Sequence, residues 1–236
     1  MLACNGEAMT QETPDVFGSA IENATAAIAG IAASDHKELV LSLGYVFQRT
    51  RSIGFLAALK SEWEKYQKKG KIAEDYPGSN QHQECLQELL ESLDRDLPDE
   101  IRFETLKAIF LVAATECEST RESLLPIEYL RVARAICGTE CVILSALHRL
   151  AQKTGYGENA AEQVKVWLSA VAEEAGLEHP ELIAYYEDNL VSKFLISERL
   201  GDRQDAIRLG TRYRLTSFGY GFCEFVSAYE RIKVSN

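Results

Sequence analysis

The chain has 236 residues, of which 46% are hydrophobic and 26% are charged. This composition is typical of a globular protein with enough apolar material for one large or two small cores. The formal net charge of −11 argues against a protein that binds nucleic acid over its whole surface, because phosphate attracts a basic surface. No stretch approaches the ~18 apolar residues that span a bilayer, and we expect a cytoplasmic protein with no membrane span.

Charged residues are unevenly distributed along the chain. Residues 36–71 carry eight Lys or Arg against three Asp or Glu, whereas residues 74–122 carry four against thirteen. Residues 139–236 are closer to balance, with eleven against fourteen. The opposed signs of the first two blocks suit antiparallel packing of neighbouring helices, or an acidic face that is offered to a basic partner.

The six cysteines show no paired spacing of the kind that disulfide frameworks and zinc sites have. They are Cys4, Cys85, Cys117, Cys137, Cys141 and Cys223. We expect buried thiols in a reducing cytoplasm. Cys137, Cys141 and His148 give the one hint of a metal site, but no second pair completes four ligands. We therefore predict no metal and no cofactor.

The N-terminal half is predicted to be helical. Residues 1–14 look like a disordered lead, and residues 15–138 are expected to form a helical domain. The Ala-rich segment 16–33 has small side chains that permit close approach of another helix, which favours a packing or oligomerisation helix. A long helix is expected over 35–69, with Gly70 as its stop.

Loops and prolines divide the remainder of this helical domain. The stretch EDYPGSNQ, residues 74–81, is typical of a loop, and a short helix at about 80–93 follows it. Pro98 then opens a helix whose first turn is acidic, as the positive end of a helix favours. Pro126 opens the next helix, which stops at Gly138.

Residues 139–236 are predicted to form a winged-helix-like domain of three helices and a β-hairpin. Apolar residues at helical spacing mark the three helices in succession. Asn159 and Glu162, three residues apart, form a capping pair at the start of the second helix. Gly176 ends that helix, and Pro180 opens the third.

The chain after the third helix has the order of a wing. The apolar segment Phe194-Leu195-Ile196 leads into a polar excursion, and the alternating run Tyr213-Arg214-Leu215-Thr216 precedes a closing apolar helix. A recognition helix followed by a strand, a wing, a return strand and a closing helix is the plan of a winged helix. We therefore expect paired strands within residues 195–216. The predicted fold class is mainly α, with a helical N-terminal bundle and this C-terminal module.

The charges of this module define its candidate contact residues. A helix that reads bases presents Arg, Lys, Asn or Gln to the major groove, but the third helix is acidic and offers Asn189 and Lys193 as base or partner contacts. The wing, by contrast, is rich in arginine: Arg199, Arg203, Arg208, Arg212 and Arg214. These are either solvated side chains on an edge hairpin, or contacts to nucleic-acid phosphates or to an acidic protein surface.

No catalytic motif is visible in the sequence. There is no Gly-x-Ser-x-Gly elbow and no kinase motif set. Gly219-Tyr220-Gly221 lacks the third glycine of a phosphate-binding loop and is interpreted as a turn into the last helix. The four histidines are scattered, and the acids within 94–100 suit a helix start better than a pair of catalytic carboxylates. We expect no catalytic residue and no enzymatic activity.

Three stretches of the chain resemble one known family. They are the Ala- and Gly-rich N-terminal helix, the segment LKAIFLVAATECESTRESLLPIEYLRVARAICGTECVILSAL, and the C-terminal segments NLVSKFLISER and YRLTSFGYGF. Together they are similar to the bacterial Abi-alpha family, helical proteins associated with abortive-infection immunity against phage. Lys193-Phe194-Leu195-Ile196 stands where that family has leucine-glycine-leucine-isoleucine. The resemblance implies a bacterial origin and a defence context, and it carries no catalytic residues.

Three functions stay open at this point. The first is a non-enzymatic subunit or adaptor of an antiphage system, which contacts a protein partner through the winged-helix-like module. That partner would be an ATPase or effector of the same operon. The alternative is a DNA-binding transcriptional regulator that contacts the DNA backbone through the basic wing. The third is an effector whose 16–33 helix lies on a membrane. The sequence leaves the oligomeric state open.

Overall fold

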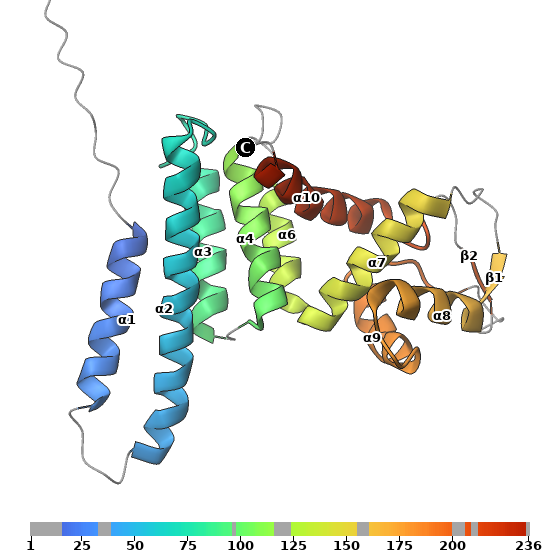
Figure 1. Cartoon of the computed structure of the whole chain (residues 1–236), viewed down its shortest axis with the longest axis horizontal. Coiled ribbons are helices and arrows are strands. Elements are labelled where there is room, and N and C mark those ends of the chain that lie inside the picture. The colour runs from blue at the N-terminus through green and yellow to red at the C-terminus, as the bar shows by residue number, and fades with distance from the viewer. Residues whose placement is uncertain are drawn as a thin grey trace, which may run out of the picture. The chain divides into compact units, whose positions relative to one another are not determined.

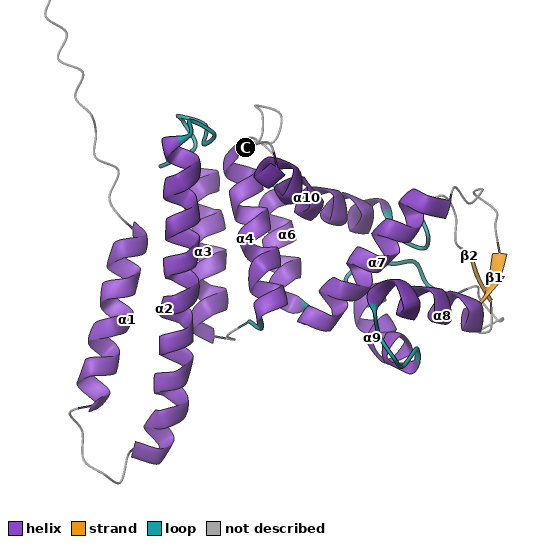
Figure 2. Ribbon diagram, viewed as in Figure 1, coloured by secondary structure: helices purple, strands orange, loops and turns teal. Residues whose placement is uncertain are grey.

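The computed structural model describes residues 16–32, 39–95, 98–115, 124–154, 161–199, 206–208 and 212–234 (Figure 1). Within these ranges, helices account for nearly all regular structure, together with two three-residue strands (Figure 2). The helices are α1 (Val16–Ala32), α2 (Leu39–Lys68), α3 (Asn80–Arg95), α4 (Glu100–Thr115), α6 (Leu125–Ala135), α7 (Gly138–Thr154), α8 (Val164–Ala175), α9 (Glu181–Ser192) and α10 (Ser217–Val234). The strands are β1 (Ala161–Gln163) and β2 (Ala206–Arg208). The predicted mainly helical class is confirmed.

The chain divides into two compact units, residues 1–79 and residues 80–236. The boundary that we expected near residue 138 lies inside the second unit, where α4 packs against α6, α7 and α10. α4 therefore belongs with the C-terminal helices, because it contacts helices on both sides of that expected boundary. The lead predicted for residues 1–14 lies outside the described residues.

In the first unit, α1 packs against the long helix α2. Leu59, Trp63 and Tyr66 of α2 are buried, and their spacing of four and three residues places them on one face of the helix. The ring of Phe17 in α1 lies 6.1 Å from that of Trp63, measured between centroids. Gly70 follows α2 with a φ of 65°, as expected for a residue that stops a helix. The oligomerisation role of α1 stays a prediction.

α4 is the central helix of the second unit. Its second half, residues 108–114, is apolar all round, and twelve of its sixteen residues are buried. A helix that is hydrophobic all round is stable in water only when other elements cover it. Here α3, α6, α7 and α10 pack against it.

Asp99 connects the starts of two helices. Its Oδ1 atom accepts a hydrogen bond from the backbone N–H of Arg102 at 2.9 Å, and its Oδ2 atom accepts one from the N–H of Gly138 at 2.9 Å. One carboxylate thus caps α4 and also lies at the N-terminus of α7, where negative charge is favourable. A Cβ atom at position 138 would collide with this carboxylate, so the contact requires glycine.

α7, α8 and α9 pack against one another. Trp167 and Val171 of α8 and Ile183 and Leu190 of α9 are buried, at the helical spacing that the sequence shows. Gly176 ends α8 with a φ of 69°, and its N–H donates to the carbonyls of the last turn. The three helices predicted for this region are confirmed.

The start of α8 differs from the prediction. The helix begins at Val164, and its cap residue Gln163 makes no side-chain capping bond. Glu162, which we expected in the first helical turn, lies in β1, opposite Ile207 of β2. Strand pairing therefore replaces the expected capping pair, and Asn159 lies outside the described residues.

The expected β-hairpin within residues 195–216 is not seen. In the described part of this segment, Ile196 and Leu215 form one isolated antiparallel bridge. β2 pairs antiparallel with β1, which precedes α8, and not with another strand of the segment. The expected return strand is instead a turn, because Tyr213 and Arg214 have left-handed backbone conformations with φ of 52° and 71°.

The sequence from Leu215 to Gly219 fixes the start of α10. The Oγ1 atom of Thr216 accepts a hydrogen bond from the Gly219 N–H at 2.9 Å and so caps the helix. The same hydroxyl donates to the Phe194 carbonyl. A Cβ atom at position 219 would collide with the Leu195 carbonyl, so this close approach requires glycine. Gly219 therefore lies inside α10 and not in the turn that we predicted.

Candidate functional site

A buried carboxylate of α9, Glu187, binds two arginines. Its side chain is 4% exposed. Arg199 donates to it twice, from Nε to Oε1 at 3.0 Å and from Nη2 to Oε2 at 2.6 Å. The Nη2 atom of Arg214 lies 2.8 Å from Oε1. We call these three residues the Glu187 cluster.

Arg214 is the most buried member of the Glu187 cluster. Its side chain is 0% exposed, and its guanidinium carbon lies 4.4 Å from the centroid of the Trp167 ring, in cation–π geometry. Its Nε and Nη2 atoms also donate to the Ser197 carbonyl. The cluster therefore ties the segment after α9 and the turn before α10 to both α8 and α9.

Opposing effects set the pKa of Glu187. Burial raises this pKa, but the hydrogen bond from Arg199 and the charge of Arg214 outweigh burial, so the pKa lies below its ordinary value. Burial lowers the pKa of Arg214, and Glu187 counteracts part of that change. Because a guanidinium stays protonated in proteins, the Glu187 cluster is ionised at neutral pH.

Two of the predicted wing arginines are engaged inside the protein. Arg214 is buried and does not reach the surface, so the structure corrects its expected role as a surface contact. Arg199 holds both oxygens of Glu187 and is one-third exposed. Arg203 and the side chain of Arg208 lie outside the described residues.

The other predicted contact residues differ in exposure. Arg212 is exposed, and its guanidinium lies 5.4 Å from the centroid of the Tyr220 ring. Asn189 donates to Glu140 Oε1 at 2.6 Å, which ties α9 to α7 and engages the amide that we expected to read a base. Lys193 is the C-cap residue of α9, with a half-buried side chain.

The exposed face of α9 carries apolar and acidic side chains. Leu182 is 40% exposed, Tyr185 is 77% exposed, and Phe194, just beyond the helix, is 76% exposed. Glu181 and Asp188 are also exposed. Positions 181, 185 and 188 share one helical face because they are three or four residues apart. We call these five residues the α9 surface.

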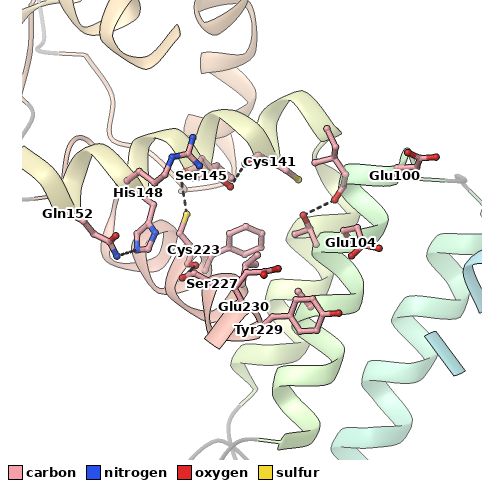
Figure 3. Close-up of a pocket in the computed structure, with 17 residues that line it drawn as sticks. Glu100, Glu104, Cys141, Ser145, His148, Gln152, Cys223, Ser227, Tyr229 and Glu230 are labelled. Carbon is pink, nitrogen blue, oxygen red and sulfur yellow. Dashed lines mark hydrogen bonds between the residues drawn. The ribbon is translucent and has the colours of Figure 1, made fainter. Parts of the chain in front are cut away.

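A pocket of about 540 Å³ opens between α4, α7 and α10 (Figure 3). Buried apolar side chains come from each helix: Ala108 from α4, Leu144 from α7 and Phe222 from α10. Exposed charged side chains also line it. They are Glu100, Glu104, Arg149 and Glu230. All three helices belong to the second unit.

The thiols and the histidine of this pocket are not arranged as an activated nucleophile. Burial raises the pKa of Cys141 to about 12 and also raises that of Cys223, so both are protonated at neutral pH and react poorly. His148 Nε2 lies 2.8 Å from Glu224 Oε1. Burial raises the pKa of Glu224, but the hydrogen bond with His148 outweighs it and the pKa falls below its ordinary value. The two thiols of the pocket are therefore not activated for nucleophilic attack.

Comparisons with known proteins leave the site to be interpreted from its own residues. No family model, curated protein or solved structure matches the chain. In the part of the chain that the structure describes, no three His, Cys, Asp or Glu residues are grouped so that they could hold a metal ion. Over the same described residues, no helix has the length and apolar character needed to cross a membrane.

Proposed function

We propose that the chain is a non-enzymatic adaptor of a bacterial antiphage system and that it binds a protein partner through a winged-helix-like module. The module comprises α7, β1, α8, α9, the segment after α9, and α10. The order of its helices is that of a winged helix, although the hairpin expected within residues 195–216 is not seen in the described residues. Two contacts support the proposal: the bridge between Ile196 and Leu215 joins the two ends of the wing segment, and β2, inside that segment, pairs with β1, which precedes α8.

The observation that carries the proposal is the composition of the α9 surface. α9 occupies the recognition position, where a helix that reads DNA presents Arg, Lys, Asn or Gln. It presents Leu182 and Tyr185 together with the carboxylates of Glu181 and Asp188. Carboxylates repel phosphate, whereas aromatic side chains are enriched at protein interfaces. The surface therefore fits a protein whose contact face is apolar and basic.

Phe194 adds a second reason to expect a partner at the α9 surface. Its φ of 58° lies in the left-handed region, which costs a residue with a Cβ atom about 1 kcal/mol. In the family that the chain resembles, glycine stands at this position. A large aromatic residue in a conformation that suits glycine, with 76% of its surface exposed, adds little to packing, so a contact outside the chain is the better explanation.

The defence context rests on the resemblance to the Abi-alpha family. In this proposal the chain has no catalytic role of its own and acts in the cytoplasm. The partner is an ATPase or effector encoded in the same operon, and the α9 surface is where the two proteins meet. The ionised Glu187 cluster holds Arg199 and Arg214, which lie before and after the polar excursion, on α9, the helix that carries this surface.

Phage plating and copurification test this function. Cells that carry the gene with its operon neighbours should lower the plating efficiency of a sensitive phage, and a tagged chain should copurify with one neighbour in stoichiometric amount. The double variant Tyr185→Arg, Phe194→Asp should lose both effects, because it places charge on exposed apolar contacts without entering the core. Lys165→Glu, an exposed change on α8, is the matched control. A wild-type chain that copurifies with none of its neighbours contradicts the proposal.

A DNA-binding regulator is the second candidate, and the exposed guanidinium of Arg212 favours it. Binding through wing arginines would depend on phosphate contacts and would weaken steeply as salt rises. Mobility shifts on duplex DNA should then be lost when Arg203, Arg208 and Arg212 are all changed to Glu. No shift for the wild-type chain at low salt would eliminate this candidate.

A further inference from the structure

We infer that the pocket between α4, α7 and α10 binds a small amphiphilic cation, a molecule with an apolar body and an amine or quaternary ammonium group. This inference does not depend on the α9 surface or on the proposed function. The pocket volume of about 540 Å³ lies within the range of about 300–1,000 Å³ that small-ligand sites occupy. Figure 3 shows the side chains of the three helices that line it.

The buried part of the lining is apolar. Ala108, Leu144 and Phe222 are each 1–2% exposed in total, and half-buried Val226 and exposed Ile101 extend the apolar wall toward the opening. Ile101 is 48% exposed, so a ligand in the pocket could contact its side chain. An aliphatic or aromatic body in this pocket would remove these side chains from water.

The polar residues of the lining use their hydrogen bonds within the protein. Ser145 donates to the Cys141 carbonyl at 2.9 Å, and Ser227 donates to the Cys223 carbonyl at 2.8 Å. Thr105 likewise donates to a carbonyl one turn earlier, at 3.0 Å. Because these hydroxyls bind their own helices, the pocket wall offers few donors to a ligand. The wall therefore selects an apolar body and not a sugar or a nucleotide.

The charges at the opening determine the sign of the ligand. Three carboxylates line it, those of Glu100, Glu104 and Glu230, against the single guanidinium of Arg149. Arg149 is already bound outside the pocket, since its Nε donates to Glu174 at 2.6 Å. The carboxylates would attract an ammonium group and repel a fatty-acid carboxylate.

Two of these carboxylates have lysine partners, which reduce the negative charge of the opening but do not reverse it. Lys107 lies 2.7 Å from Glu104, but its side chain is 8% exposed and does not line the pocket. Lys233 lies 3.4 Å from Glu230, and its Nζ atom lies 4.3 Å from the centroid of the Tyr229 ring, which also lines the pocket. With Arg149 paired to Glu174, three carboxylates against two lysines leave the opening with a net negative charge.

Methyl-group NMR titration of the full chain tests the inference with three octyl probes: octyltrimethylammonium, octanol and octanoate, each below its micelle concentration. We expect saturable shifts at Ile101, Leu144 and Val226 with octyltrimethylammonium. Its binding should be about fivefold tighter than that of octanoate at low salt, a ratio that corresponds to roughly 1 kcal/mol of charge interaction. The affinity for octanol should lie between those for the other two probes.

Two kinds of variant locate the site and its charge preference. Val226→Trp fills the pocket from a half-buried position and should reduce binding of every probe at least tenfold. Glu104→Gln with Glu230→Gln should bring octyltrimethylammonium and octanoate to similar affinities, while the exposed control Glu178→Gln should leave the ratio unchanged. Octanoate binding as tightly as the ammonium probe would overturn the inference. So would unchanged binding to a folded Val226→Trp variant, or shifts that do not saturate.

Discussion

Replacing Glu187 by glutamine removes one charge from the buried Glu187 cluster while keeping the size of the side chain. Arg214, with a side chain that is 0% exposed, is then left without its carboxylate in a place that water does not reach. Arg199 is less affected, because its side chain is 33% exposed and can turn to solvent. Loss of stability in the second unit is therefore the expected result.

The size of the effect follows from the burial of the pair. Removing one partner of a buried ion pair costs about 3–5 kcal/mol, and the exposure of Arg199 places this case near the lower end, at about 3 kcal/mol. In a domain of about 150–250 residues, each kcal/mol lowers Tm by about 2–4 °C. We expect the Tm of the second unit to fall by about 10 °C.

Fluorescence of Trp167 provides the measurement, because this ring stacks on Arg214. The chain has two tryptophans, so a Trp63→Phe background leaves Trp167 as the single reporter of the second unit. Glu181→Gln is the matched control, an exposed carboxylate on the same helix whose removal should change stability by less than about 0.5 kcal/mol. Equal Tm values for Glu187→Gln and Glu181→Gln would refute the reasoning about a buried, ionised pair.

Replacing the whole pair separates lost charge from lost packing. Glu187→Leu combined with Arg214→Met substitutes apolar side chains for both ions. Such exchanges of buried ion pairs are often neutral or stabilising. We expect this double variant to be more stable than Glu187→Gln alone, and a further loss would show that the arginine contributes mainly through its stacking on Trp167.

Two further predictions concern the pH dependence of stability and the substitution of two glycines. Because the pKa of Glu187 is lowered in the folded protein, this carboxylate contributes fully to the free energy of unfolding above its unfolded-state pKa of about 4.3. That contribution is lost as pH falls through the folded pKa. The stability difference between wild type and Glu187→Gln should therefore narrow below about pH 4 in urea titrations. Gly219→Ala should destabilise the protein by about 2 kcal/mol, because the added Cβ atom collides with the Leu195 carbonyl. Gly54→Ala, with open space around it, should instead stabilise α2 by about 0.5 kcal/mol. Thermal melts of both variants provide the comparison.

The helices could be predicted from the sequence because their signals are local. Apolar residues at intervals of three and four, a glycine such as Gly176 at the end of a helix, and a proline such as Pro180 before the next one each act within a few residues. The return strand could not be predicted. Tyr213 and Arg214 adopt positive φ without being glycine, and nothing in their residue types indicates a turn.

The candidate site could be predicted from the sequence only in part, for a different reason. We expected the charged residues of the wing to face water, as most do. Glu187, however, stands at helical spacing between Ile183 and Leu190, both buried. That spacing was a signal that the carboxylate points inward and needs a cation. The pocket could not be predicted, because α4, α7 and α10 are far apart in the sequence and only the fold brings them together.

The contacts of the Asp99 carboxylate have a practical consequence for the choice of fragments to express. A fragment that starts at residue 139 would discard this residue and all of α4, leaving the beginning of α7 without its anion and Leu144 without a neighbour on one side. Such a fragment would tend to precipitate even if every contact residue of α9 were intact. The sensible expression boundary is at residue 80, and a failed experiment on a shorter piece would report on the missing helices and not on the partner.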